Sequence, residues 1–269
     1  MPEATRNRVR RTGLMRFRDI VRIFFIFSLL GLDVITEHLF GEEIEFESEF
    51  VVLLSMLLFG SFFCGWACPF GNISYFLKKL GRRILPRWQF GLPSRWDRPL
   101  RYLKYAMLAG FVAVFITQRI SYFGDHFEMY ESTWFSRVYF ITKVFSVLVL
   151  SLVLGRFYCR YLCWQKAAYN LMNRLSLTSI VRNVTACVGC KKCDSVCPMD
   201  VNVSSRVAIR GRDCISCYNC VDAGTCPPKV DAMELRFLGR RVDPRLYAYA
   251  VTAIYFLLTL LALIYLPRG

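Results

Sequence analysis

Histidine is nearly absent from this chain, since only His38 and His126 occur among its 269 residues. This scarcity leaves little basis for a haem held by two histidines inside the protein. Acidic residues are also few, 20 against 35 lysines and arginines, so the formal net charge is +15. A basic balance of this size can indicate nucleic-acid binding. The arginines cluster beside apolar segments instead of along one folded surface, so we expect no nucleic-acid partner.

Long stretches of the sequence have few charged residues, and residues 246–266 have none. Hydrophobic residues make up 55% of the chain, and the mean hydropathy is +0.36. A transmembrane helix needs about 20 predominantly apolar residues. The predicted fold class is therefore a mainly α-helical membrane protein, with duplicated transmembrane helical hairpins, a C-terminal transmembrane helix and spans near residues 20–39, 49–63, 102–118, 138–158 and 246–266.

Charges flank these apolar stretches unevenly. Residues 1–22 carry seven arginines and residues 78–104 carry nine lysines or arginines, whereas residues 41–49 carry five glutamates and no base. Positive residues favour the cytoplasmic side of a membrane. We therefore expect a multi-pass protein of the inner (cytoplasmic) membrane of a prokaryote, with residues 159–245 on the cytoplasmic side and both histidines on the outer side.

Four of the twelve cysteines form two pairs at the ends of apolar segments. Cys64 and Cys68 lie in SFFCGWACPFGN, and Cys159 and Cys163 lie in RFYCRYLCWQKA, an offset of 95 residues (64 to 159, 68 to 163). Residues four apart share one face of a helix, so two duplicated hairpins can bring four thiolates around one point. This is the ligand set of an iron–sulfur cluster, or of an all-cysteine zinc site. The alternative is that these cysteines only pack as small apolar side chains.

The other eight cysteines crowd into residues 187–226. CVGCKKCDSVCP has the bacterial ferredoxin spacing, in which three cysteines bind one [4Fe-4S] cluster and the fourth binds the other. CISCYNCVDAGTCP repeats this spacing, with five residues instead of three before the last cysteine. The alternative is a zinc ribbon. We predict a cytoplasmic two-cluster ferredoxin-like module, with one [4Fe-4S] cluster on Cys187, Cys190, Cys193 and Cys226 and the other on Cys214, Cys217, Cys220 and Cys197.

With these motifs, the chain resembles the NapH-like and NosR-like membrane-bound [4Fe-4S] ferredoxin-type quinol dehydrogenases. The resemblance rests on CGWACP and the eight-cysteine module, and it covers roughly residues 20–230. It departs at Trp164, which stands where a proline is expected after the second cysteine pair. The resemblance implies an electron-transfer subunit that passes electrons between the quinone pool and other subunits of a respiratory complex. It also supports a third iron–sulfur cluster at the two cysteine pairs.

Three polar residues near the outer end of the first apolar segment, Asp33, Glu37 and His38, form a candidate quinone or proton site. The alternative is that they are hydrated at the membrane interface. The alternative function for the whole chain is a membrane redox protein that serves metal-centre or cofactor assembly. The predicted organisation is a basic N-terminus (1–19), a first hairpin (20–77), a basic loop (78–101), a second hairpin (102–180), the ferredoxin module (181–240) and a C-terminal helix (241–269).

Overall fold

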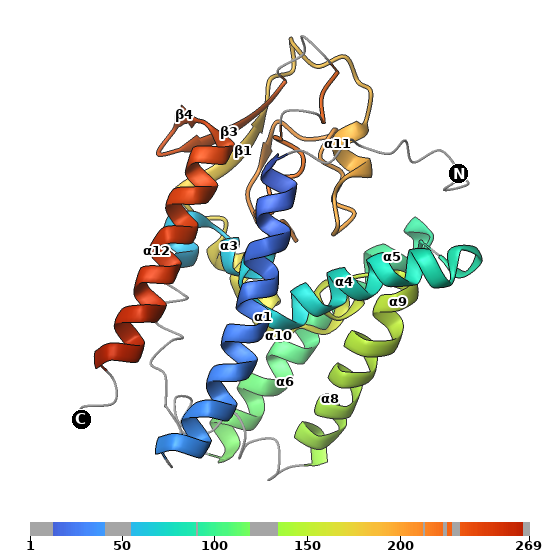
Figure 1. Cartoon of the computed structure of the whole chain (residues 1–269). Coiled ribbons are helices and arrows are strands. Elements are labelled where there is room, and N and C mark those ends of the chain that lie inside the picture. Colours follow the sequence, from blue (N-terminus) through green and yellow to red (C-terminus); the bar gives the residue numbers. More distant parts are fainter. Residues whose placement is uncertain are drawn as a thin grey trace.

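The computed structural model of the protein describes residues 13–40, 55–89, 91–118, 134–211, 213–222, 225–227 and 232–265. Its elements form a helical part and a smaller module built on a β-sheet, which lies at the top of Figure 1. The long helix α12 (Pro244–Tyr265) follows the module and runs back beside the first helix. The first and last helices of the chain therefore lie side by side over part of their length.

The helical part alternates long helices with short turns. Its elements are α1 (Gly13–Phe40), α3 (Phe62–Trp66), α4 (Pro69–Ile84), the 3-10 turn η2 (Pro86–Trp88), α5 (Ser94–Leu100), α6 (Leu103–Gln118), α8 (Trp134–Phe145), the π-helical turn η3 (Ser146–Leu150), α9 (Ser151–Leu154), the π-helical turn η4 (Tyr158–Leu162) and α10 (Trp164–Met172). Pro69 begins α4, where its preset φ favours the first helical turn and its missing N–H leaves no unmet bond.

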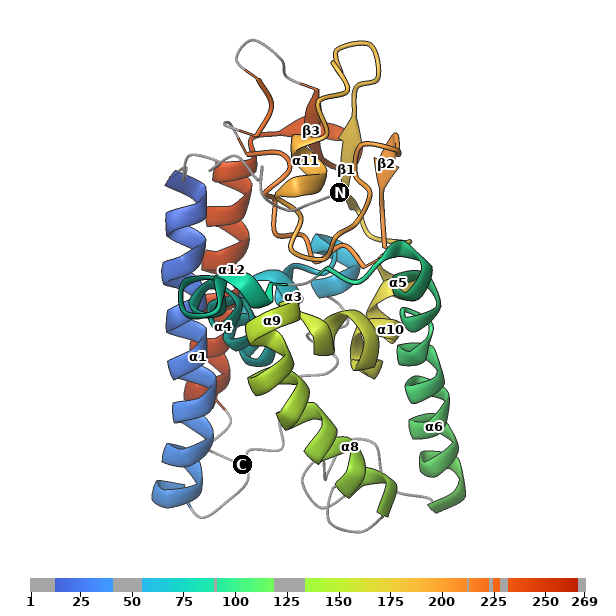
Figure 2. The same cartoon turned by 90° about the vertical axis from the view of Figure 1, so that its right-hand side faces the viewer.

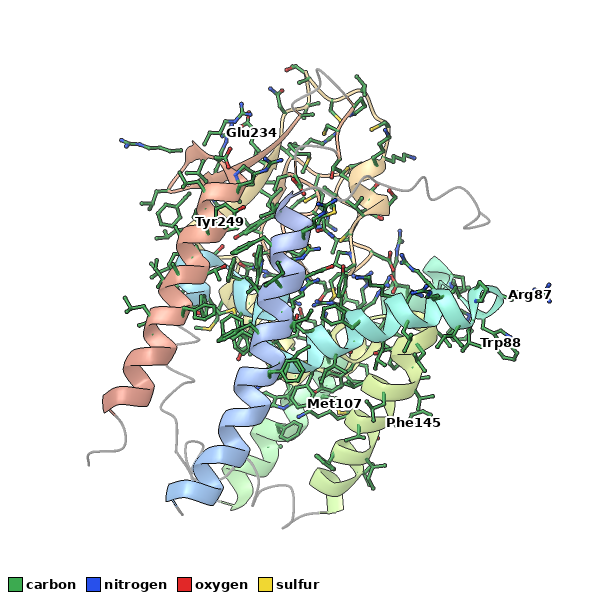
Figure 3. The ribbon with its side chains drawn as sticks, in the orientation of Figure 1. Arg87, Trp88, Met107, Phe145, Glu234 and Tyr249 are labelled. Atoms are coloured by element: carbon green, nitrogen blue, oxygen red, sulfur yellow. The ribbon has the colours of Figure 1, made fainter. Side chains whose placement is uncertain are left out.

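Aromatic side chains join α1 to α12. Phe17 of α1 meets Tyr249 of α12 edge to face, with ring centroids 4.4 Å apart. Further along the same helices, the ring centroids of Phe24 and Phe256 lie 4.3 Å apart. Figure 2 shows these two helices together on one side of the molecule and α6 on the other, with α8 between them. The far end of η2 projects away from the rest of the protein, and Arg87 and Trp88 point outward there (Figure 3).

The module contains a four-stranded antiparallel sheet in the order β2-β1-β3-β4. Its strands are β1 (Thr178–Arg182), β2 (Ala208–Ile209), β3 (Met233–Phe237) and β4 (Arg240–Val242), and one short helix, α11 (Lys192–Ser195), lies beside them. Ile180 on β1 faces Ile209 on one side and Leu235 on the other, and all three are buried. The β3–β4 hairpin turns through Leu238 and Gly239, both at positive φ, as a two-residue hairpin loop requires.

The prediction of a membrane fold is wrong for the part of the chain that the structure describes. No helix there combines the length and the sustained apolarity that crossing a bilayer requires. The apolar run 102–118 yields only the 16 residues of α6, and the run 138–158 is divided among three short elements before a left-handed turn at Gly155 (φ 82°). The predictions of transmembrane hairpins, of a C-terminal span and of a multi-pass inner-membrane protein are therefore wrong for the described residues. Residues 49–54 of the second predicted span lie outside them.

A network of charged groups fastens the module to the helical part. Asp213, directly before Cys214, accepts hydrogen bonds from Arg101 (3.0 Å) and Asn170 (2.8 Å) and pairs with the buried Lys104. Arg101 also bonds the carboxylate of Asp97 at 2.9 Å. Because a buried charge is stable only when paired, these ion pairs hold the two parts in one arrangement.

Asp97 extends this network to η4. Its carboxylate accepts a 2.6 Å hydrogen bond from the Tyr161 hydroxyl and lies 2.7 Å from Arg160, which also pairs with Asp200 of the module. Burial alone would raise the pKa of Asp97, but the Tyr161 hydrogen bond and the charges of Arg160 and Arg101 outweigh it. They hold that pKa below its ordinary value of 3.8.

The crossing of α4 over α9 depends on a glycine. A Cβ at Gly81 would lie 1.9 Å from the Leu152 carbonyl oxygen, a backbone atom that cannot turn away. We expect Gly81→Ala to lower the free energy of unfolding by about 1–3 kcal/mol, the cost of overpacking. Chemical denaturation measures this loss. Gly91→Ala is the control, because nothing lies within 4 Å of a Cβ there; equal stability of the two variants would contradict the observed crossing.

Asp97 should make the stability of the protein depend on pH. Because its folded pKa is depressed, the ionised carboxylate contributes stability at neutral pH, and this contribution disappears as the pH falls through the folded pKa. We expect Asp97→Asn to cost about 1–2 kcal/mol near pH 7, and the difference from the wild type to shrink as the pH falls below 3.8 and through the folded pKa. Denaturation at several pH values measures both. Asp200→Asn, at a carboxylate with 50% exposure, should cost less, and a pH-independent deficit in Asp97→Asn would refute the assignment.

Candidate metal centres

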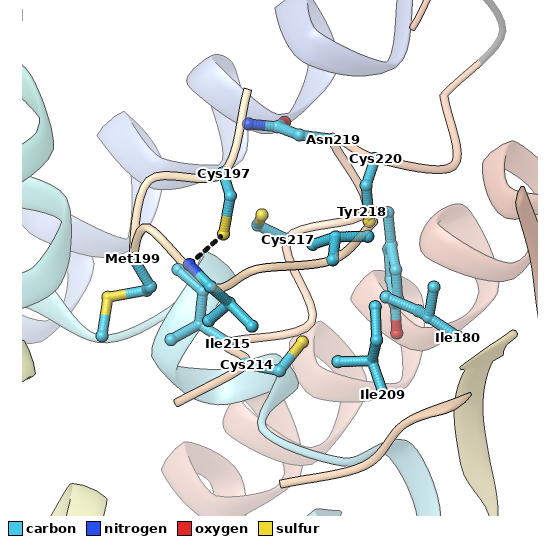
Figure 4. A pocket seen from close by; sticks show the side chains of 12 residues that line it. Ile180, Cys197, Met199, Ile209, Cys214, Ile215, Cys217, Tyr218, Asn219 and Cys220 are labelled. Atoms are coloured by element: carbon cyan, nitrogen blue, oxygen red, sulfur yellow. Dashed lines mark hydrogen bonds between the residues drawn. The ribbon is translucent and has the colours of Figure 1, made fainter. Parts of the chain in front are cut away.

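Four cysteines of the module face one internal space, here called the inner cavity. Cys197, Cys214, Cys217 and Cys220 line it together with apolar side chains that include Ile180, and the empty space measures about 370 Å³. Figure 4 shows their sulfur atoms directed into this space from two segments, one that carries Cys197 and one that carries the other three. The backbone N–H of Val201 donates to the Cys197 sulfur at 3.4 Å. The predicted second set of ligands is therefore brought together around one point.

The other four cysteines of the module line a second space, here called the outer cavity. Cys187, Cys190, Cys193 and Cys226 surround about 340 Å³ of empty space, with Val188 and Lys191 beside them. The arrangement places Cys226, from the second motif, with three cysteines of the first. It matches the crossed assignment predicted from the ferredoxin spacing.

The two motifs also share a backbone conformation. Gly189 (φ 68°) and Ser216 (φ 48°) occupy equivalent places, 27 residues apart (189 to 216), and so do Lys191 (φ 56°) and Tyr218 (φ 58°). Left-handed residues alternating with ordinary ones turn successive N–H groups towards one side, which makes a concavity that favours anions. Positive φ is a strained conformation for the three residues here that are not glycine. This conformation turns backbone N–H groups towards the sulfur atoms.

The remaining four cysteines meet in the helical part and are called the helical quartet. Cys64 lies in α3, Cys159 lies in η4, and Cys68 and Cys163 are the residues immediately before α4 and α10. Each thiol lies close enough to others of the set to influence their ionisation. The predicted convergence of the two CxxxC pairs is thus present in the fold.

The backbone around the helical quartet repeats with the same 95-residue offset as the sequence. Gly60 and Gly155 both have positive φ, of 68° and 82°. The N–H groups of Cys68 and Cys163 then donate to the carbonyls five residues back, each at 2.9 Å. This widened turn ends one helix and begins the next, so that each pair presents both sulfur atoms on one side.

Burial dominates the ionisation of the helical quartet. It raises the pKa of Cys64, Cys159 and Cys163 to about 12, and that of Cys68 moves in the same direction. Desolvation disfavours a thiolate unless a positive charge compensates it. Buried thiols of this kind need bound metal to ionise together, which distinguishes this site from four cysteines exposed to water.

Buried cations surround the helical quartet. Arg156 is only 4% exposed; its Nη1 donates to the Cys64 carbonyl at 3.0 Å, while Nε and Nη2 have no hydrogen-bond partner among the described residues. Arg22 is fully buried and donates to the Gly65 carbonyl at 2.7 Å and 3.0 Å. Arg22 also pairs with Asp19 at 3.9 Å, whereas Arg156 has no ion pair among the described residues, and an unpaired buried cation is costly. A cluster held by four thiolates carries the negative charge that this shell lacks, so the residues fit such a group.

The helical quartet lies directly against the loop of the inner cavity. A Cβ at Gly65 would fall 2.2 Å from the Ile215 carbonyl oxygen, and the Trp66 indole donates to the Ser216 carbonyl at 3.0 Å. Lys166 joins the two sites, since its Nζ donates to Ser61 at 3.0 Å and to the Cys214 carbonyl at 2.6 Å. The inner and outer cavities adjoin as well, because Cys193 lies close enough to raise the pKa of Cys220. The three sets of thiols form a continuous series.

Among the described residues, no three His, Cys, Asp or Glu side chains are close enough to hold a single metal ion together. A four-iron cluster distributes its cysteines over different iron atoms, so its ligands stand farther apart than the ligands of one ion.

Several important residues at these sites carried no signal in the sequence. Arg22, Lys104, Arg156 and Lys166 resemble ordinary basic flanking residues until the fold buries them. Asp33, Glu37 and His38 belong to α1, but their side chains are outside the described part, as is all of His126.

Comparison with known proteins supports the chemistry of the cysteines. A family model described as a 4Fe-4S binding domain matches residues 50–87 and 138–182, which contain the helical quartet. No solved structure matches the chain significantly.

Three relatives have informative names. YccM of Escherichia coli, named as a candidate electron transport protein, is 31% identical over 222 residues, which cover 79% of this chain and 60% of YccM. The regulatory protein NosR of Pseudomonas aeruginosa is 27% identical over 68% of this chain and 27% of NosR. The ferredoxin-type protein NapH of Haemophilus influenzae is 27% identical over 70% of this chain and 67% of NapH.

The matched region thus spans less than two thirds of YccM and about a quarter of NosR. Together, the matched domain and these relatives support an iron–sulfur electron-transfer role. The chain is thus similar to the NapH-like and NosR-like ferredoxin-type proteins.

Proposed function

We propose that this chain is the electron-transfer subunit of a redox complex and that three iron–sulfur clusters carry electrons through it in series. The inner and outer cavities would each hold a [4Fe-4S] cluster, and the helical quartet would hold the third. The observation that carries this proposal is the closeness of each set of thiols to the next. Gly65 and Lys166 contact the inner-cavity loop at one junction, and Cys193 is near enough to Cys220 to raise its pKa at the other.

The residues of the chain have distinct roles in this proposal. Twelve thiolates hold the clusters, which supply reversible one-electron transfer when bound. Backbone N–H groups, such as those of Val201 and Lys166, donate to ligand sulfurs and favour their negative charge. Arg156 and Arg22 place fixed positive charge at the helical quartet, where it stabilises the added electron most. These side chains therefore influence the potential without themselves accepting electrons.

The helical quartet is one end of the series, and quinone is the proposed partner there. The family resemblance supports this partner, as does the position of Asp33, Glu37 and His38 on α1, since quinone reduction or oxidation also requires proton acceptors or donors. Other subunits of a respiratory complex would exchange electrons at the opposite end. Service in metal-centre assembly is the competing function, but the cysteines of the helical quartet are buried or half-buried, which favours a retained cluster over one that is released to a client.

Single cysteine variants test the helical quartet. We expect Cys64→Ser and Cys163→Ser to have the same effect, the loss of about four iron atoms per protein, although the two residues belong to different repeats. Both variants should keep the module clusters and accept electrons from dithionite, yet fail to exchange electrons with a quinol analogue. Iron analysis, EPR spectroscopy and quinol oxidation measure these outcomes on the purified full chain.

Cys190→Ser is the matched comparison for this experiment. It should remove one module cluster and leave the signal of the helical quartet in place. Unchanged iron in Cys64→Ser and Cys163→Ser would show that these residues only pack. Unequal iron loss in the two variants would show that the two pairs do not share one cluster.

A further inference from the structure

One end of the series of cysteines opens to the surface. Of the twelve cysteines, only Cys190 is exposed; the others are buried or partly buried. Val188, a neighbour of Cys190, is 62% exposed and also lines the outer cavity. Electron transfer rates fall steeply with distance, so an external carrier must dock where the centre is nearest to the surface. Residues 187–192 form that place, here called the docking loop.

The docking loop is positively charged. Lys191 and Lys192 are both exposed, and Lys191 lines the outer cavity itself. Arg182 hydrogen-bonds the thiol of Cys187 at the base of the loop. The positive charges of Lys191, Lys192 and Arg182 are therefore concentrated at the edge of the outer cavity.

The nearest acid in the sequence offsets only part of this charge. Asp194 follows Cys193 in α11, and its carboxylate accepts hydrogen bonds from the backbone N–H (2.8 Å) and the hydroxyl (2.5 Å) of Ser204. These bonds direct the carboxylate along the module and leave Lys191 and Lys192 to set the field outside. The exposed side chain of Val188 supplies an apolar centre between them and the cavity.

We infer that the docking loop is the binding surface for an acidic electron-carrier protein, which exchanges electrons with the outer-cavity cluster. A basic rim around a small apolar centre fits a carrier whose own redox group lies beneath an acidic rim, because complementary charge steers the encounter and the apolar contact brings the two centres close. This inference rests on the proposed function, since it requires a cluster in the outer cavity. In each encounter one electron passes between the centres, so the carrier is oxidised by one electron as the cluster is reduced, or the reverse.

Charge reversal of the docking loop tests this inference. Stopped-flow mixing of the holoprotein with a reduced acidic [2Fe-2S] ferredoxin gives the second-order rate constant for reduction of the module. For Lys191→Glu/Lys192→Glu we expect this rate constant to fall by tenfold or more at low salt, because electrostatic steering contributes about 10- to 1,000-fold. The difference should nearly close at about 1 M salt, where the Debye length is only about 3 Å.

A matched variant separates docking from net charge. Arg83→Glu/Arg87→Glu makes the same change of charge at the tip of α4 and η2, remote from the module (Figure 3). It should leave the rate with ferredoxin within about twofold of the wild type, whereas steering at the docking loop predicts tenfold or more. Reduced lumiflavin, a small donor without an acidic rim, gives the rate for a donor that does not dock. The ratio of the ferredoxin rate to the lumiflavin rate should still fall by about tenfold or more in Lys191→Glu/Lys192→Glu, which separates docking from a changed cluster potential.

The outcomes are distinguishable. Intact module EPR signals with an unchanged ferredoxin rate in Lys191→Glu/Lys192→Glu would overturn the docking inference and leave the proposed function standing. Equal slowing in the two charge-reversal variants would also overturn it, since net charge would then suffice, and so would equal slowing of the lumiflavin reaction. Absence of module clusters from the wild-type holoprotein would instead overturn the proposed function.

Discussion

The close approach of Gly65 to the loop of the inner cavity is the contact on which the other features depend. Only a residue without a side chain allows α3 to lie against the Ile215 carbonyl oxygen. This approach lets Trp66 and Lys166 bond the same loop, and it places the helical quartet beside the inner cavity. Because electron transfer requires short separations, the contact unites two structurally separate sets of cysteines in one possible path.

Buried charge gives this junction its specificity. Arg22, Arg156, Lys104 and Lys166 are all removed from water, and each adds a desolvation cost. Asp213 compensates Lys104 directly, and carbonyl groups accept the other hydrogen bonds. At the helical quartet, however, the cationic side chains exceed the nearby carboxylates. Bound cluster charge would complete the balance there, so that metal binding and the packing of the two parts would stabilise each other.

Sequence reasoning was strongest where ligands are close in the chain and weakest where apolar runs had to be interpreted. The ferredoxin spacing predicted both sets of module cysteines, and the two cavities contain those sets. Hydropathy failed for the fold class because it averages over residues and does not register a backbone break. Gly60 and Gly155 end their helical segments at left-handed turns, and these same turns direct the cysteine pairs inward.

The sequence by itself determined the twelve candidate ligands, their grouping into two kinds of motif and the 95-residue repeat, because a CxxC or CxxxC spacing limits where neighbouring sulfur atoms can point. Tertiary structure alone decided which cations are buried, which cysteine is exposed and which set of thiols adjoins which. Those features arise from contacts between residues as far apart as Arg18 and Cys217 or Gly65 and Ile215. Burial is a property of the whole packed chain, so no local pattern could have assigned it.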